Sequence, residues 1–235
     1  RIRGATAPKR NTFSNANRTR DPAIAEKLYW QTFEHLRKIC PDFTQVKQHK
    51  GFIHRVKRDI FAIDSTTLKL SLNCIDWARH RSKKAAAKTH MCINIGNSLP
   101  TFAVVEDAAH HDSKRADVLC AGLKDGDVML ADRAYVDLAF LYDLSERGVF
   151  FVLREKENMV FEIRKLRSHK DPRILADETV RMSRKGSAEK YPESLRRITA
   201  IVEVDGRDME MTFITNNFAW SPRTVVELYR ARWAI

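Results

Sequence analysis

The sequence predicts an α/β fold that carries a β-rich insertion before its last helix. Between residues 59 and 155, short apolar stretches alternate with amphipathic helical stretches, as in layered α/β cores. Between residues 156 and 215 the chain is charged, lacks strong helical periodicity and contains several strand-like stretches. The chain has 235 residues, 43% of them hydrophobic, so it can bury a sizeable core without disulfide bonds.

The N-terminal region predicts an arm followed by a helix. Residues 5–20 are polar and predict an extended arm. Asp21 and Pro22 then form an N-cap and first-turn pair, and apolar residues follow at helical spacing as far as Cys40. Pro41 ends that helix.

The central region predicts the element order β-β-β-α-β-α-β. Its strand-like segments have either a continuous apolar run or period-two alternation, and its helical segments are amphipathic, the second being closed by Gly148. The strand-like stretches are 60–64, 68–72, 91–95, 101–107, 127–132 and 149–155, one more than the five strands of that order, and the predicted helices are 112–123 and 136–148.

The β-rich stretch and the last helix have their own sequence signals. Strands are predicted at 179–183, 196–204 and 209–216, and Asp205-Gly206 predicts a hairpin turn between the last two. Ser221-Pro222 then predicts the start of a helix. Neither end of the sequence carries a cap signal, so we expect a fragment that lacks both ends. The predicted regions are a basic N-terminal arm and helix (1–58), a core (59–155), a β-rich insertion (156–220) and a truncated last helix (221–235).

The positive charge is concentrated in two runs. The net charge is +12; residues 1–58 hold 14 Lys or Arg against four Asp or Glu, and residues 78–90 hold five basic residues and no acidic ones. Such runs are often solvated faces, but runs that hold the entire excess favour contacts with nucleic-acid phosphates. In the second run the candidate DNA-binding residues are Arg79, Arg81, Lys83, Lys84 and Lys88.

Several classes of protein are not supported by the sequence. The four cysteines are widely spaced and form no CxxC pair, which predicts reduced thiols in a cytosolic protein and disfavours a zinc site. No apolar run approaches the roughly 18 residues of a transmembrane helix. No GxGxxG or Walker loop is present, so a nucleotide cofactor is not expected.

Asp64 and Asp132 are the candidate catalytic and metal-binding residues, because each is predicted to end an apolar strand. If those strands are neighbours, the two carboxylates lie close together at the rim of the sheet. Paired carboxylates suit Mg²⁺, which prefers hard oxygen ligands and can support phosphoryl transfer. The alternative is that both residues only cap turns.

Three short motifs occur in order along the chain: IDST at 63–66, ADRAY at 131–135 and YRARW at 229–233. Together they resemble the DDE transposases of bacterial insertion sequences, specifically the insertion-sequence-four group with its Y-x2-R-x3-E-x6-K signature. Tyr229 and Arg232 match the first two members of that signature. The resemblance places the third acid at position 236, so we expect the 235-residue chain itself to be inactive.

The resemblance implies a ribonuclease-H-like core, a mixed sheet with a β insertion before the last helix. It implies metal-dependent cleavage of element-end DNA, followed by strand transfer of the 3′-OH to target DNA. Asp64 and Asp132 would hold Mg²⁺ or Mn²⁺, two ions in all, and Tyr229 and Arg232 would contact DNA phosphate. The implied partners are double-stranded DNA, both the terminal inverted repeats and the target. The resemblance also implies a homodimer in the DNA complex. It implies a bacterial cytoplasmic location, with the protein associated with the nucleoid when it is bound to DNA.

Other candidate residues and functions stay open. Arg133 is interpreted either as a ligand of the scissile phosphate or as a partner of an active-site carboxylate. His110, His111 and Asp112 are weaker candidates for metal ligands. Ser65 and Thr66 could be nucleophiles, but no His-Asp pair is placed nearby, so a turn or a supporting role behind the metal ligands is favoured. Trp77 and Trp220 are expected either in the core or an interface, or stacked on bases. The alternative functions are a nuclease without strand transfer and an inactive DNA-binding remnant of a decayed element.

Overall fold

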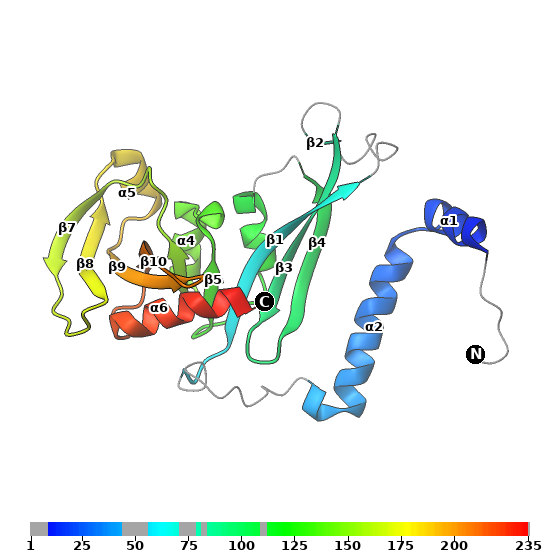
Figure 1. Cartoon of the computed structure of the whole chain (residues 1–235), viewed down its shortest axis with the longest axis horizontal. Helices are drawn as coiled ribbons and strands as arrows, with labels where there is room; N and C mark the ends of the chain where they lie inside the picture. The colour runs from blue at the N-terminus through cyan, green and yellow to red at the C-terminus, as the bar shows by residue number, and fades with distance from the viewer. Residues whose placement is uncertain (1–8, 44–55, 71–78, 81–83, 109–111, 235) are drawn as a thin grey trace. The chain divides into compact units, whose positions relative to one another are not determined.

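The computed structural model describes residues 9–43, 56–70, 79–80, 84–108 and 112–234 (Figure 1). It divides into two compact units, Arg1–Gln45 and Val46–Ile235, which are described separately. Within the described ranges, no helix combines the length and the apolar character needed to cross a membrane.

The first unit is helical. Helix α1 spans Arg10–Thr19 and helix α2 spans Ala23–Ile39, followed by a 3₁₀ turn at Pro41–Phe43. The predicted extended arm over 5–20 is therefore wrong for its described part, where no Gly or Pro interrupts helix formation. The side chain of Asp21 accepts a hydrogen bond of 2.9 Å from the backbone N–H of Ala23, which confirms the predicted cap.

The second unit is built on one large mixed sheet, which confirms the predicted mixed α/β class. The described strands are ordered β2-β3-β1-β5-β6-β10-β9-β8-β7, and β4 pairs with β3. Strands β1, β5 and β6 are parallel, and the other pairs are antiparallel. The bounds are β1 Ile60–Leu70, β2 Arg79–His80, β3 Lys84–Asn94, β4 Leu99–Asp107, β5 Val128–Ala131, β6 Phe150–Arg154, β7 Phe161–Leu166, β8 Ile174–Met182, β9 Leu195–Val204 and β10 Arg207–Thr215.

Two predicted elements differ in extent from those observed. The predicted strands 60–64 and 68–72 form one strand, β1, because β1 pairs with β3 without a break from Phe61 to Leu70; residues 71–72 lie outside the described ranges. The predicted helix 112–123 is only a 3₁₀ turn at Asp112–Arg115 and the short helix α3 at Ala116–Leu119. The predicted helix 136–148 is present as α4, Leu138–Glu146, and Gly148 closes it with a φ of 71°.

Helices cover both faces of the sheet, and strand alternation assigns the side chains to these faces. Ile63 and Met129 belong to the apolar cluster that contains α3 and α4. Ile60, Ala62, Val128 and Leu130 belong to the cluster on the opposite face, which includes Val225, Leu228 and Tyr229 of helix α6, Pro222–Ala231. Because side chains alternate along a strand, positions 64 and 132 fall on the α6 face.

The predicted β-rich insertion consists of β7 to β10 and the short helix α5, Lys185–Lys190. It extends the same sheet, because β10 pairs with β6 at Phe213 and Arg154 (Figure 1). Asp205 and Gly206 have φ values of 51° and 74°, the left-handed values that a two-residue hairpin turn requires, which confirms the predicted turn.

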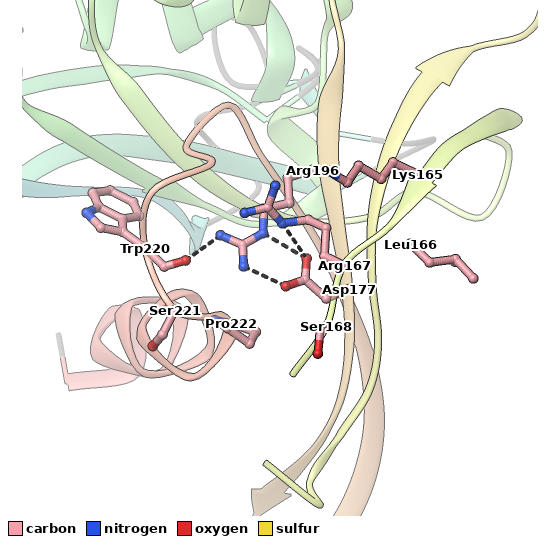
Figure 2. A pocket seen from close by; sticks show the side chains of 9 residues that line it. All are labelled: Lys165, Leu166, Arg167, Ser168, Asp177, Arg196, Trp220, Ser221 and Pro222. Atoms are coloured by element: carbon pink, nitrogen blue, oxygen red, sulfur yellow. Dashed lines mark hydrogen bonds and ion pairs between the residues drawn. The ribbon is translucent and has the colours of Figure 1, made fainter. Parts of the chain in front are cut away.

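A buried ion pair ties this insertion to the start of α6. The guanidinium of Arg196 donates two hydrogen bonds, of 2.8 and 2.7 Å, to the carboxylate of Asp177, and both side chains are buried. Arg196 also donates to the carbonyl oxygen of Trp220, immediately before the Ser221 cap (Figure 2). It donates as well to the carbonyl oxygen of Asn217. The pair lines a cavity of about 560 Å³, and it fixes the segment from which α6 begins.

We predict that Asp177→Ala destabilises the protein by about 3–5 kcal/mol, because it leaves the buried charge of Arg196 without its partner. Asp208→Ala is the matched control: Asp208 also pairs with an arginine, Arg173, but both side chains are half exposed, and such pairs contribute below about 1 kcal/mol. The measurement is urea unfolding of both variants. Equal losses would contradict a structural role for the buried pair.

Candidate active site

The parallel pairing of β1 and β5 brings Asp64 and Asp132 together. The last residue pair in this register is Ile63 with Ala131, so the two aspartates are the next residues on adjacent strands. Asp132 follows the end of β5 as predicted, but Asp64 lies within β1 rather than at its end. Because β5 stops at Ala131, the side chain of Asp64 has no parallel neighbour and is 50% exposed, and that of Asp132 is 40% exposed.

Backbone N–H groups orient both carboxylates. The N–H of Ser65 donates to Asp64 Oδ1 at 2.8 Å, and the N–H of Arg133 donates to Asp132 Oδ1. Asp132 is the N-cap of the 3₁₀ turn Arg133–Tyr135, so local backbone geometry dictates its position. In each carboxylate, Oδ1 accepts the backbone hydrogen bond, and Oδ2 points away from that backbone N–H group.

Arg232, just beyond α6, faces both of these oxygens. Its Nη1 lies 3.3 Å from Asp64 Oδ2, and its Nη2 lies 3.8 Å from Asp132 Oδ2. The guanidinium is held over the ring of Tyr229, with 5.2 Å between the guanidinium carbon and the ring centroid. One buried arginine therefore compensates the two negative charges that the sheet brings together.

The ring of Tyr229 packs against the guanidinium of Arg232. Its ring is buried and packs against the rings of Phe213 and Trp233, at centroid distances of 4.9 and 5.6 Å. Burial raises the pKa of the Tyr229 hydroxyl, and the nearby Arg232 opposes that increase. The DNA contacts predicted for Tyr229 and Arg232 stay predictions; here Tyr229 contacts Arg232 and the core.

The two aspartates fit a divalent cation by their chemistry. Both offer hard carboxylate oxygens, and both are partly exposed. The cationic guanidinium of Arg232 already faces the Oδ2 atom of each. Across the described ranges, no group of three or more His, Cys, Asp or Glu side chains is arranged to hold a metal ion. The described site thus supplies two carboxylates that could serve as metal ligands.

The remaining predicted residues lie in different surroundings. Arg133 pairs with the exposed Glu157 at 2.8 Å, and both roles expected for Arg133 stay predictions. Lys88 pairs with Asp112 at 3.0 Å, and Trp220 packs against Phe150. Arg79 and Lys84 belong to paired strands, and the DNA contacts of this basic run stay predictions. The predicted residues outside the described ranges are Arg81, Lys83, Trp77, His110 and His111.

Sequence reasoning missed a buried polar cluster beside the aspartates. His90 is fully buried, and its ring nitrogens face Tyr135 and Glu106. Both His90 and Tyr135 stand within stretches that the sequence singled out for other reasons, the basic run and the ADRAY motif. Their inward orientation depends on strand register, which composition does not specify.

The chain is similar to two transposases of insertion sequences. It is 25% identical over 181 residues to a probable transposase for insertion sequence element IS5377 of Geobacillus stearothermophilus, covering 77% of this chain and 47% of that protein. It is 28% identical over 178 residues to the putative transposase y4zB of Sinorhizobium fredii, covering 74% and 48%. The chain thus spans about half the length of these relatives.

Among solved structures, the chain is similar to a piggyBac transposase in a synaptic complex with hairpin DNA. The identity is 12%, the TM-score is 0.45, and the match covers 91% of this chain and 45% of that one. The family model described as the transposase DDE domain matches residues 55–235, which contain both aspartates and Arg232. The chain therefore belongs to the transposase DDE domain family.

Proposed function

We propose that the whole protein to which this chain belongs catalyses DNA transposition, by metal-dependent cleavage of element-end DNA and transfer of the freed 3′-OH to target DNA. The observation that carries the proposal is the pairing of Asp64 and Asp132 on neighbouring parallel strands, faced by Arg232, within the matched DDE domain. The proposed core is ribonuclease-H-like, with β4, β3, β1, β5 and β6 as its five strands.

Asp64 and Asp132 are proposed to hold Mg²⁺ or Mn²⁺, two ions in all. When bound, such metals supply activation of the attacking hydroxyl and stabilisation of the leaving oxygen. The backbone N–H groups of Ser65 and Arg133 hold one oxygen of each carboxylate and so aim the other outward. Arg232 compensates their charge, and we propose, as the resemblance implies, that it also contacts DNA phosphate.

A third acid is proposed at position 236, as the resemblance implies. Two described acids near the end of the core have other partners: Glu227 pairs with Arg230 at 3.3 Å, and Glu155 pairs with Arg197 at 2.7 Å. The Nε atom of Arg232 is buried and has no hydrogen-bond acceptor among the described residues. A carboxylate that follows Arg232 in the chain could supply that acceptor.

The proposed partner is double-stranded DNA, both terminal inverted repeats and target. The basic runs at 1–58 and 78–90 provide positive charge for phosphate contacts. We also propose that the protein forms a homodimer in the DNA complex. Its proposed location is the bacterial cytoplasm, at the nucleoid. A nuclease without strand transfer and an inactive remnant remain the competing functions.

In the full-length protein, we predict that Asp64→Ala or Asp132→Ala abolishes cleavage of element-end DNA and leaves DNA binding near normal. Carboxylates hold the metal, whereas basic side chains hold the phosphates. Asp143→Ala is the control, because Asp143 is an exposed aspartate paired with Arg147 on α4. Cleavage in Mg²⁺ by either active-site variant would contradict the assignment of Asp64 and Asp132 as catalytic residues.

The products of the same assay separate the competing functions. Transposition requires that the cleaved 3′ end be joined to target DNA, which is detected as a branched or inserted product. Cleavage without joining would support the nuclease, and binding without cleavage by the unaltered protein would support the inactive remnant.

We predict that DNA binding weakens steeply with salt and that Arg79→Glu with Lys84→Glu reduces the slope of log K against log salt by about 2, roughly 0.9 per lost phosphate contact. Both positions lie in the paired strands β2 and β3. The control is Lys185→Glu with Lys190→Glu on α5, which makes the same charge change at exposed positions. An unchanged slope in the first variant would show that the β2–β3 run is a solvated face.

A further inference from the structure

A buried polar cluster is centred on His90 of β3, the strand that pairs with β1. The ring of His90 is fully buried; its Nδ1 lies 3.4 Å from Tyr135 Oη and 3.8 Å from Asp112 Oδ1, and its Nε2 lies 3.2 Å from Glu106 Oε1. Asp112 and Glu106 are in turn paired with Lys88 and Arg115. Burying so many charged groups costs free energy unless each is held by a partner.

The cluster touches both aspartate-bearing segments. His90 is the direct cross-strand partner of Ser65, the residue after Asp64, in the β1–β3 register. Tyr135 ends the turn that Asp132 caps, and its backbone N–H donates to the carbonyl of Asp132 at 3.0 Å. The side chain of Ser65 also lies near the Tyr135 hydroxyl. A chain of polar contacts therefore runs from Asp64 through Ser65 and Tyr135 to the Asp132 turn.

The environment of the cluster favours the uncharged imidazole. Burial lowers the pKa of His90, despite the opposing effects of Asp112 and Glu106, so the imidazole is neutral at pH 7. Nδ1 and the Tyr135 hydroxyl lie within hydrogen-bond distance at 3.4 Å, with the donor set by the tautomer of the ring, and Nε2 faces Glu106 Oε1 at 3.2 Å without hydrogen-bond geometry. The Tyr135 hydroxyl is the polar group that lies between His90 and the β1 strand.

We infer that Tyr135, held by His90, is a positioning residue that fixes the separation of the Asp64 and Asp132 carboxylates for the metal. This inference rests on the proposed function. A phenylalanine would fill the same volume in the apolar cluster but would bond to neither Ser65 nor His90. The hydroxyl therefore determines how closely the two segments are held, rather than how well they pack. Residues that orient the metal ligands through hydrogen bonds, without contacting the metal, typically change metal affinity or activity 10–100-fold when they are mutated.

The experiment compares Tyr135→Phe with Tyr191→Phe in the full-length protein. Tyr191 is a matched control: it is equally buried, belongs to the same apolar cluster, and its hydroxyl pairs at 2.9 Å with Ser145 of α4. Mn²⁺ binding is measured without DNA by calorimetry, and thermal unfolding is recorded in metal-free buffer. We expect similar losses of Tm in both variants, but Mn²⁺ affinity about 10–100-fold weaker only for Tyr135→Phe.

Ser65→Ala is the second variant, since it removes one contact of Tyr135 but retains the backbone N–H that binds Asp64. We expect it to weaken Mn²⁺ binding in the same direction, so the test does not depend on the folding of one variant. Equal Mn²⁺ affinities for Tyr135→Phe, Ser65→Ala and Tyr191→Phe would overturn the positioning role. Unchanged Mn²⁺ binding in Asp64→Ala and Asp132→Ala would instead overturn the proposed metal site, and the inference with it.

Discussion

The parallel pairing of β1 with β5 is the constraint on which the site depends. It places Ile63 beside Ala131, and the next residue of each strand is an aspartate. A shift of this register by one residue would move Asp64 to the opposite face of the sheet. The apolar side chains before the aspartates fix the register, because Ile60, Ala62, Val128 and Leu130 must all face α6. The core and the site are therefore specified by the same alternation.

Two carboxylates held this close repel each other, and α6 supplies the compensating charge. Arg232 reaches both aspartates because Tyr229 and Phe213 support it from the core. The start of the same helix is fixed by Arg196, a residue of the insertion. The insertion thus contributes to the site at a distance, through the placement of one helix, without supplying either of the two carboxylates.

The sequence predicted which helices and strands are present better than it predicted where they begin and end. Strand-like stretches and the Asp205-Gly206 turn located β8, β9 and β10, and Ser221-Pro222 located α6, but β7 was not predicted. It did not predict that β1 continues past Asp64, because Ser65 and the threonines that follow are equally compatible with a turn and a strand; pairing with β3 decides between them. Asp64 and Asp132 were identified from motifs, whereas His90 was not, because its role depends on which residue lies opposite.

The continuity of the sheet from β6 to β10 has a consequence for how the molecule folds. Strand β6 ends at Arg154, and its partner in β10 is Phe213, so the whole insertion is a closed loop between two hydrogen-bonded neighbours. Helix α6 follows that loop, and the contact between Arg232 and Asp64 joins residues 168 positions apart. Closing such long loops costs chain entropy before any contact repays it. The carboxylates are thus brought together by contacts between β1 and β5, but their counter-charge arrives only when the chain beyond the insertion has docked.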